Sequence, residues 1–334
     1  MFYLVTWFIL WGVLWAAYFM LDGFDLGVGI MSPFLGRDEA SRSAIRAAIG
    51  PIWDGNEVWL ITAGGATFAA FPSAYATLFS ELYPAMLLIL FGLIVRGVSL
   101  EFRSKGETPG WKRLWDAGFF AGSLVPAFLF GVAFGNLFRG LPIDARGYHG
   151  TLLTLLNPYA LLTGVLFVTL FMTHGALWLA MKAGGGLGES ALRRARPLWL
   201  VTAAAAVGFL LWSALGTRLA ENYLARPVWL VVPLLAVVSL VLIRVWVSKG
   251  RPLPAFLSSC ATIVLIVFTG VIGLYPNLIP SRLDPGHSLT IFNAASSATT
   301  LKVMTIVAVI FVPIVIAYQA WVYRIFRGKS GGAY

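Results

Sequence analysis

The sequence predicts an all-α integral membrane protein with nine transmembrane helices, and three observations support this fold class. Of 334 residues, 59% are hydrophobic and only 11% are charged, whereas soluble domains carry about 25% charged residues. The 35 glycines, 24 phenylalanines and 13 tryptophans match the enrichment of glycine and aromatic residues in membrane proteins. The apolar residues also form long runs between short charged segments. These features exclude a soluble enzyme, and they exclude a disordered chain because such chains are poor in aromatic residues.

Nine segments meet the requirement of about 20 mostly apolar residues for a membrane-spanning helix. The first covers residues 2–21 and stays apolar to residue 35. It lacks a basic start and a small-residue cleavage site, so we expect a retained helix and not a signal peptide. The others are expected at residues 58–80, 82–100, 117–138, 147–181, 197–217, 227–243, 252–281 and 303–323. The run 147–181 is too long for one straight helix, and Asn157 and Pro158 indicate where its helix begins, since proline suits the first turn.

The positively charged residues predict the orientation of the helices. If the N-terminus lies outside, alternate loops place 17 Lys and Arg residues on the cytoplasmic side and six on the opposite side. Because cytoplasmic loops carry an excess of Lys and Arg, we expect a multi-pass protein of the cytoplasmic membrane with its C-terminus inside. The net charge of +10 is dispersed between apolar runs and does not form the clustered basic face of a nucleic-acid-binding protein.

Ionisable residues inside predicted spans are candidates for function, because a charge in the membrane is costly. Asp22 and Asp25 lie three residues apart and share a helix face, and Arg96 lies inside the third predicted span. The predicted topology places Asp25, Asp54, Glu57 and Arg96 at a similar depth near the cytoplasmic side. We therefore expect these four residues to form one polar cluster that carries protons.

Each of these residues also has a purely structural interpretation. Asp54 and Glu57 follow Pro51 and would complement the positive end of a helix dipole. Arg96 would extend to the membrane surface or form a static ion pair with Asp25. Substitution of Asp54 by asparagine separates the two interpretations, because it keeps the shape and removes the protonatable group.

The sequence is poor in ligands for a redox centre. Cys260 is the single cysteine, which excludes a cysteine-based cluster within this chain. His174 is the one histidine inside a predicted span, and we expect it to be a hydrogen-bonded packing residue. No metal site is predicted.

Four segments resemble subunit II of the cytochrome bd-type quinol oxidases. They read DGFDLGVG at residues 22–29, WDGNEVWLITAGGA at 53–66, FRSK at 102–105 and GVAFGN at 131–136, and LNP at 156–158 also fits. The close matches cover roughly the first half of the chain, whereas the second half agrees in span number and loop placement. The long string that begins at Trp53 is the most specific of these motifs.

The resemblance implies two four-helix bundles plus one peripheral helix within a single membrane domain. Residues 1–140 would form the first bundle, 141–281 the second, and 282–334 the ninth helix and a cytoplasmic tail. It also implies a complex in a bacterial cytoplasmic membrane that oxidises quinol and reduces dioxygen to water. Subunit I would hold haem b and haem d, while a small single-span accessory subunit and lipid are further candidate partners.

The resemblance further implies that this chain lacks its own haem ligands and contributes the subunit interface near the haems. Trp53 and Asn56 are candidates for that interface, and Asp25, Asp54, Glu57 and Arg96 for the proton route. Two alternatives remain, a proton-coupled secondary transporter and a haem-free assembly scaffold. Transporters typically place midplane sites in corresponding positions of two halves, whereas the acids here occupy only the first three spans.

Overall fold

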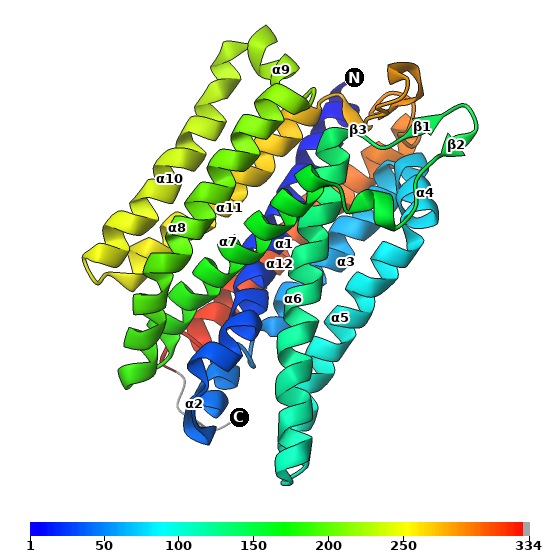
Figure 1. The fold of residues 1–334 in the computed structure, drawn as a ribbon. Coiled ribbons are helices and arrows are strands. Elements are labelled where there is room, and N and C mark those ends of the chain that lie inside the picture. Colours follow the sequence, from blue (N-terminus) through cyan, green and yellow to red (C-terminus); the bar gives the residue numbers. More distant parts are fainter. Residues whose placement is uncertain (330–334) are drawn as a thin grey trace.

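The computed structural model describes residues 1–329 and shows long helices whose axes are roughly aligned (Figure 1). Within these residues, eight helices are long and apolar enough to cross a membrane, which confirms the all-α membrane class. They are α1 (Phe2–Leu35), α5 (Tyr83–Phe102), α6 (Pro109–Arg139), α7 (Pro158–Lys182), α8 (Gly185–Gly216), α10 (Val231–Ser248), α11 (Pro252–Leu274) and α12 (Ala298–Ile325).

The second predicted span, residues 58–80, is not a single helix. It is divided into α3 (Trp53–Ala70) and α4 (Pro72–Glu81), which meet at Phe71. Pro72 lacks the backbone N–H that would continue the hydrogen bonding of α3, and it occupies the first turn of α4, the position where a helix tolerates proline best. α3 also begins five residues before residue 58, with the polar side chains of Asp54 and Glu57 in its first turns. The expected count of nine spanning helices is therefore not confirmed.

Short elements join the ends of the long helices. On the side of the α1 C-terminus these are α2 (Glu39–Ala47) and the three-ten helix η1 (Arg103–Lys105). The elements at the other end are α9 (Ala220–Ala225), the three-ten helices η2 (Leu153–Leu155), η3 (Pro227–Leu230) and η4 (Pro285–His287), and two antiparallel strand pairs. The strand pairs are β1 (Ile143–Asp144) with β2 (Gly147–Tyr148), and β3 (Asn277–Ile279) with β4 (Leu289–Thr290).

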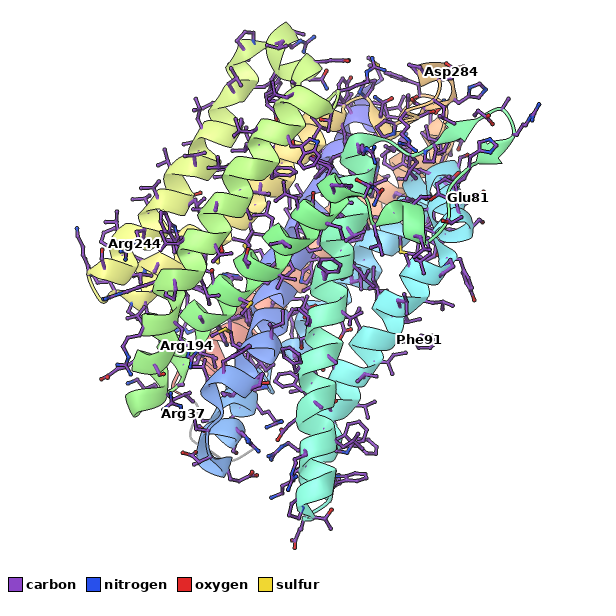
Figure 2. The ribbon with its side chains drawn as sticks, viewed as in Figure 1. Arg37, Glu81, Phe91, Arg194, Arg244 and Asp284 are labelled. Atoms are coloured by element: carbon purple, nitrogen blue, oxygen red, sulfur yellow. The ribbon has the colours of Figure 1, made fainter. Side chains whose placement is uncertain are left out.

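The first residues of α1 and the last turn of α12 lie at opposite ends of the bundle (Figure 1). Charged side chains gather at the same two ends. Figure 2 shows Arg37, Arg194 and Arg244 toward one end, and Glu81 and Asp284 toward the other. The helix that contains Pro158 begins where the sequence predicts, because the Asn157 side chain accepts a hydrogen bond from the Ala160 N–H and caps it.

α1 is the central helix, and it packs against α3, α6, α7 and α11. Its backbone touches α7 directly, since a Cβ added at Gly27 would lie 1.8 Å from the carbonyl oxygen of Phe171. A Cβ at Gly175 would likewise lie 2.4 Å from the Val28 nitrogen. Small residues allow such close crossings in membranes. The helices thus approach closely at Gly27, whereas nothing lies within 4 Å of a Cβ at Gly55.

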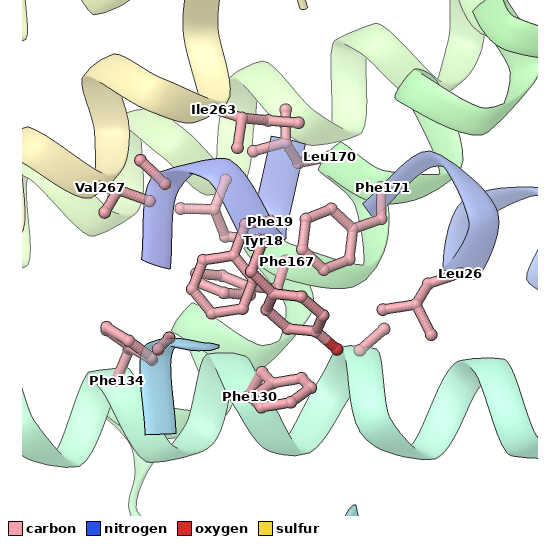
Figure 3. Packing of buried hydrophobic residues seen from close by; sticks show 14 of the residues in the cluster. Tyr18, Phe19, Leu26, Phe130, Phe134, Phe167, Leu170, Phe171, Ile263 and Val267 are labelled. Carbon is pink, nitrogen blue, oxygen red and sulfur yellow. The ribbon is translucent and has the colours of Figure 1, made fainter. Parts of the chain in front are cut away.

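Aromatic rings fill the space where α1, α6 and α7 meet (Figure 3). The Phe19 ring meets the edges of Phe130, Phe134 and Phe167, with ring centroids 5.6, 5.2 and 5.1 Å apart. Edge-to-face geometry is favourable for aromatic pairs. This packing fixes the position of α1 one turn before Asp22.

α12 lies at the periphery of the bundle. Leu301 is the one buried residue among those of α12, and the helix packs against α1 and α3. Near its first turns, the Trp7 indole N–H donates to the Leu301 carbonyl and the Thr305 hydroxyl, at 3.2 and 3.1 Å. The helix is therefore held to the core by a few specific contacts.

Candidate functional site

A charged cluster is buried where α1, α3 and α5 meet. Arg96 Nη1 lies 2.7 Å from Asp22 Oδ1, and neither side chain is exposed. Arg96 Nη2 lies 3.2 Å from Glu57 Oε2, and the Glu57 side chain is 21% exposed. One guanidinium on α5 therefore joins a fully buried acid on α1 to a partly accessible acid on α3.

The ion pair of Arg96 differs from the structural alternative considered for the sequence. That alternative paired Arg96 with Asp25, whereas the structure places Asp22 against the guanidinium. Residues three apart share a helix face, so either acid satisfies the sequence pattern. The rotation of α1, fixed by its contacts with α6 and α7, determines which acid meets α5.

Asp25 is fully buried and has a different partner. Its Oδ2 accepts a hydrogen bond of 2.7 Å from Asn56 Nδ2, and Asn56 is also fully buried. Asn56 Oδ1 in turn accepts from Gln319 Nε2 at 2.9 Å and from the Tyr323 hydroxyl at 2.8 Å. A continuous hydrogen-bonded chain thus connects α12 to Asp25 through α3.

The contribution of α12 is absent from the sequence-based prediction. Gln319 is a polar residue in a largely apolar predicted span. This was the one feature of the sequence that could have indicated a contribution of α12. Tyr323 ends that span, where an aromatic residue is ordinarily explained by the membrane interface. Their partner Asn56 is more than 260 residues away, so no local pattern could identify the contact.

Asp54 and Trp53 lie at the edge of the cluster. Asp54 is exposed, and its Oδ1 accepts a hydrogen bond of 2.7 Å from the Gly55 N–H. It precedes Glu57 by three residues on α3 and therefore shares a helix face with it. Trp53 packs toward α5, because a Cβ added at Gly97 would lie 3.0 Å from its ring. The structure therefore does not bring Asp54 into direct contact with Arg96 or Asp25, but places it at the accessible side of Glu57.

The arrangement is suited to binding protons. Asp22 and Glu57 share one cation, Arg96, and the fully buried Asp25 interacts with the same cation electrostatically without pairing with it. Burial and repulsion between carboxylates both oppose the ionisation of every acid at once. The cluster as a whole can therefore hold a proton, and Glu57 is its partly exposed member.

A second ionic network lies near the C-terminal end of α1. Arg103 donates two hydrogen bonds to Glu39, at 2.7 and 2.9 Å, and a third to Asp116 at 2.7 Å. Arg46 also pairs with Asp116. The hydrogen bonds from Arg103 lower the pKa of Glu39 from 4.5 to about 2. This network holds α2 and the start of α6 against the end of α5.

His174 has the geometry of a packing residue. Its Nδ1 lies 2.6 Å from Ser259 Oγ, its Nε2 lies 2.9 Å from the Met20 carbonyl oxygen, and its ring stacks on Phe256 at 4.6 Å. Both ring nitrogens are thus engaged within the chain, so His174 does not fit axial ligation of a haem. Among the described residues, no group of three or more His, Cys, Asp or Glu side chains could hold a metal ion.

Comparisons with known proteins agree over almost the whole chain. Residues 3–326 match the family described as cytochrome bd terminal oxidase subunit II. Cytochrome bd-I ubiquinol oxidase subunit 2 of Escherichia coli (strain K12) is 40% identical over 349 residues, which cover 95% of this chain and 92% of that protein. Cytochrome bd ubiquinol oxidase subunit 2 of Bacillus subtilis (strain 168) is 39% identical over 97% of this chain and 95% of its own length.

A solved structure shares the fold. One chain in the structure of bd oxidase from Geobacillus thermodenitrificans superposes with a TM-score of 0.80 and covers 98% of this chain and 99% of its own. Its sequence identity is 18%, so this similarity concerns the fold alone. The high coverage extends the similarity beyond the first half, where the sequence motifs lie.

Proposed function

Because the chain belongs to the cytochrome bd terminal oxidase subunit II family, we propose that it is the haem-free subunit of a complex that oxidises quinol and reduces dioxygen to water. Relatives named as ubiquinol oxidase subunits support a respiratory oxidase with quinol as the reductant. The partner is subunit I of that complex, in a bacterial cytoplasmic membrane. Haem b and haem d would be ligated by subunit I, and both ring nitrogens of His174, the one histidine inside a predicted span, are engaged within this chain.

The buried acid–arginine cluster is the observation that carries the proposed role of this chain. Reduction of dioxygen to water consumes protons as well as electrons, and a buried reaction centre needs a path for them. We assign Asp54 to the mouth of that path and Glu57 to the first buried acceptor. Arg96 and Asp22 would stabilise the charge during transfer, and Asp25 would hold the proton inside the buried cluster.

Several features of the arrangement remain part of the proposal. α3 would be the ninth crossing, since 18 residues span about 27 Å as a helix, close to the hydrocarbon thickness of about 30 Å. The opposite positions of the α1 start and the α12 end (Figure 1) support an odd number of crossings. We still expect two bundles and one peripheral segment, formed by residues 1–140, 141–281 and 282–334. We also expect the N-terminus outside and the C-terminus inside. Part of that segment and the C-terminus itself lie outside the described residues.

Trp53 and Asn56 were expected near the haems of the partner. Asn56 is fully buried inside this chain, so its proposed contribution is indirect, through the position of α3. Trp53 is half-buried between α3 and α5 and remains a candidate for the subunit interface. Membership of an oxidase subunit family argues against the transporter alternative. The assembly scaffold differs from our proposal in one respect, namely that its acids would not carry protons.

The test is Asp54→Asn in the complete complex. We expect full assembly and haem content, because Asp54 is exposed and bonds only its neighbouring backbone. Quinol oxidation and proton uptake should be slowed, since the substitution keeps the shape and removes the proton acceptor. Glu107→Gln is the matched control, because Glu107 is an exposed acid between η1 and α6, outside the cluster. Normal turnover in Asp54→Asn would contradict the role of Asp54, and loss of assembly would favour the scaffold.

A further inference from the structure

The hydrogen-bonded chain from α3 and α12 to Asp25 has a fixed direction. The Trp59 indole Nε1 lies 2.7 Å from Gln319 Oε1. An indole N–H only donates, so the Gln319 carbonyl must face Trp59 and its NH₂ group must face Asn56. Gln319 Nε2 then donates to Asn56 Oδ1 at 2.9 Å.

The same reasoning fixes the Asn56 amide. With its carbonyl occupied by Gln319, and by the Tyr323 hydroxyl at 2.8 Å, Asn56 has only its NH₂ group left for Asp25. The bond to Asp25 Oδ2 is 2.7 Å. Two donors on α12 thus determine that Asp25 meets a donor and not an acceptor.

The orientation of Asn56 affects whether Asp25 can release a proton. A donor stabilises the carboxylate, whereas an amide carbonyl facing Asp25 would accept from the protonated acid and stabilise that form. Burial and the acids Asp22 and Glu57 favour the protonated form, and Arg96 on α5 opposes them. The donor from Asn56 therefore counteracts burial at the position where a proton must leave.

We propose that Trp59, Gln319 and Tyr323 are positioning residues that lock the Asn56 amide with its N–H toward Asp25, and that α12 thereby sets how readily Asp25 releases its proton. The inference rests on the proposed proton route through Asp25. It gives the peripheral helix a specific task, because Gln319 and Tyr323, which line an apolar cavity of about 520 Å³ together with residues of α1 and α3, both bond to Asn56. The hydrogen bonds from Trp7 at the other end of α12 do not reach Asn56.

The groups that face Asp25 come from several helices. Asn56 on α3 bonds to Asp25 directly, and the groups that interact with Asp25 electrostatically are Asp22 on α1, Glu57 on α3, Arg96 on α5 and Tyr323 on α12. On α7, His174 faces the Met20 carbonyl, which lies five residues before Asp25 on α1, about one and a half turns away. Trp59, Gln319 and Tyr323 carry no charge. Substituting them therefore changes the orientation of Asn56 without changing the charge of the cluster.

The experiment compares Gln319→Leu combined with Tyr323→Phe against the wild-type complex. Without its two donors, Asn56 is free to turn its carbonyl toward Asp25, which then holds its proton more tightly. We expect the acidic limb of the pH profile of quinol oxidation to move to higher pH by about one unit, the size expected for one hydrogen bond to a charged group. The infrared carboxylic-acid band that Asp25→Asn removes should also persist to higher pH.

Thr305→Val is the matched control. It removes the hydroxyl that accepts from Trp7 and weakens α12 at its other end without touching Asn56. This variant should keep the wild-type pH profile, and a shift equal to that of the double variant would overturn the inference. If the double variant fails to assemble, Trp59→Phe is the deciding variant, since it frees only the Gln319 amide. It should move the acidic limb of the pH profile in the same direction by a smaller amount.

The outcomes separate this inference from the proposed function. If Asp25→Asn lowers turnover but the pH profile and the infrared band are unchanged in the positioning variants, the inference is wrong and the proton route stands. If Asp25→Asn itself has wild-type turnover, the proton route is wrong, and the inference fails with it.

Discussion

Arg96 is the residue that holds the buried cluster together, because it faces acids on two other helices. Its guanidinium is fully buried and reaches Asp22 at 2.7 Å and Glu57 at 3.2 Å. Arginine suits this position since its planar guanidinium has two terminal nitrogens, and one of them lies beside each carboxylate. In a membrane no water replaces the lost partner of a charged group. Loss of either acid would therefore leave the charge of Arg96 incompletely paired.

Removing one acid should therefore destabilise the protein strongly. We expect Asp22→Asn to lower the free energy of unfolding by about 3–5 kcal/mol, the usual cost of leaving one member of a buried ion pair unpaired. Thermal unfolding of the purified complex checks this, with Arg37→Gln, an exposed arginine, as the control. Asp22→Asn combined with Arg96→Met should recover part of the loss. An unfolding temperature equal to wild type in the single variant would contradict a stabilising pair.

The sequence predicts which ionisable residues are buried, but not how they pair. Asp22, Asp25 and Arg96 are recognisable because each interrupts an apolar run. Their pairing depends on the rotation of α1 about its axis, which the ring contacts of Phe19 with Phe130 and Phe134 help to fix. Such contacts join positions more than 100 residues apart and leave no local pattern.

At the scale of elements, close backbone contact between α1 and α7 sets the geometry of the site. A Cβ at Gly27 would lie 1.8 Å from the Phe171 carbonyl oxygen, which is backbone and cannot move aside cheaply. Gly27→Ala should therefore force the helices apart and prevent assembly of a complex with full haem content. Gly110→Ala is the control, because nothing lies within 4 Å of a Cβ at Gly110 and alanine favours a helix. Normal assembly of Gly27→Ala, measured by haem content after purification, would argue against so close a crossing.

The ionic network between α2, α5 and α6 should give stability that depends on pH. Bonding to Arg103 lowers the pKa of Glu39 from 4.5 to about 2. A lowered pKa means that this stabilisation is complete above about pH 4.5 and is lost as the pH falls toward 2. We expect Glu39→Gln to unfold at a lower temperature than wild type at neutral pH, with the difference disappearing at acidic pH. The effect should be small because the Glu39 side chain is 56% exposed. A difference independent of pH would contradict the ionic origin.

The elements differ in how well the sequence predicts them. Long charge-free runs predict eight of the spanning helices because the thickness of the bilayer sets their length. The division at Pro72 was visible as a proline, yet hydropathy averaged over residues 58–80 joins α3 and α4. The contact of α12 with the cluster could not be predicted, since the hydropathy of α12 is typical of any lipid-facing helix while the contact depends on Gln319 and Tyr323.

At the scale of the whole molecule, this chain combines a scarcity of redox ligands with a buried acid cluster. Both ring nitrogens of His174 bond within the protein, whereas three acids and one arginine lie together in the membrane. This combination fits a division of labour in which subunit I carries out electron transfer and this chain supplies protons. The complex, and not the isolated chain, is therefore the appropriate sample for functional tests.

The central claim is tested most directly by the rate of proton uptake during one turnover. The fully reduced complex is mixed with dioxygen in the presence of a pH-sensitive dye, for wild type, Asp25→Asn and the control Glu107→Gln. A positioned proton-transfer group commonly contributes about 10²–10⁴-fold to the rate of its step, so we expect Asp25→Asn to slow proton uptake at least about tenfold. The control should match wild type. Wild-type proton uptake in an Asp25→Asn complex with full haem content would contradict the proton route through this chain.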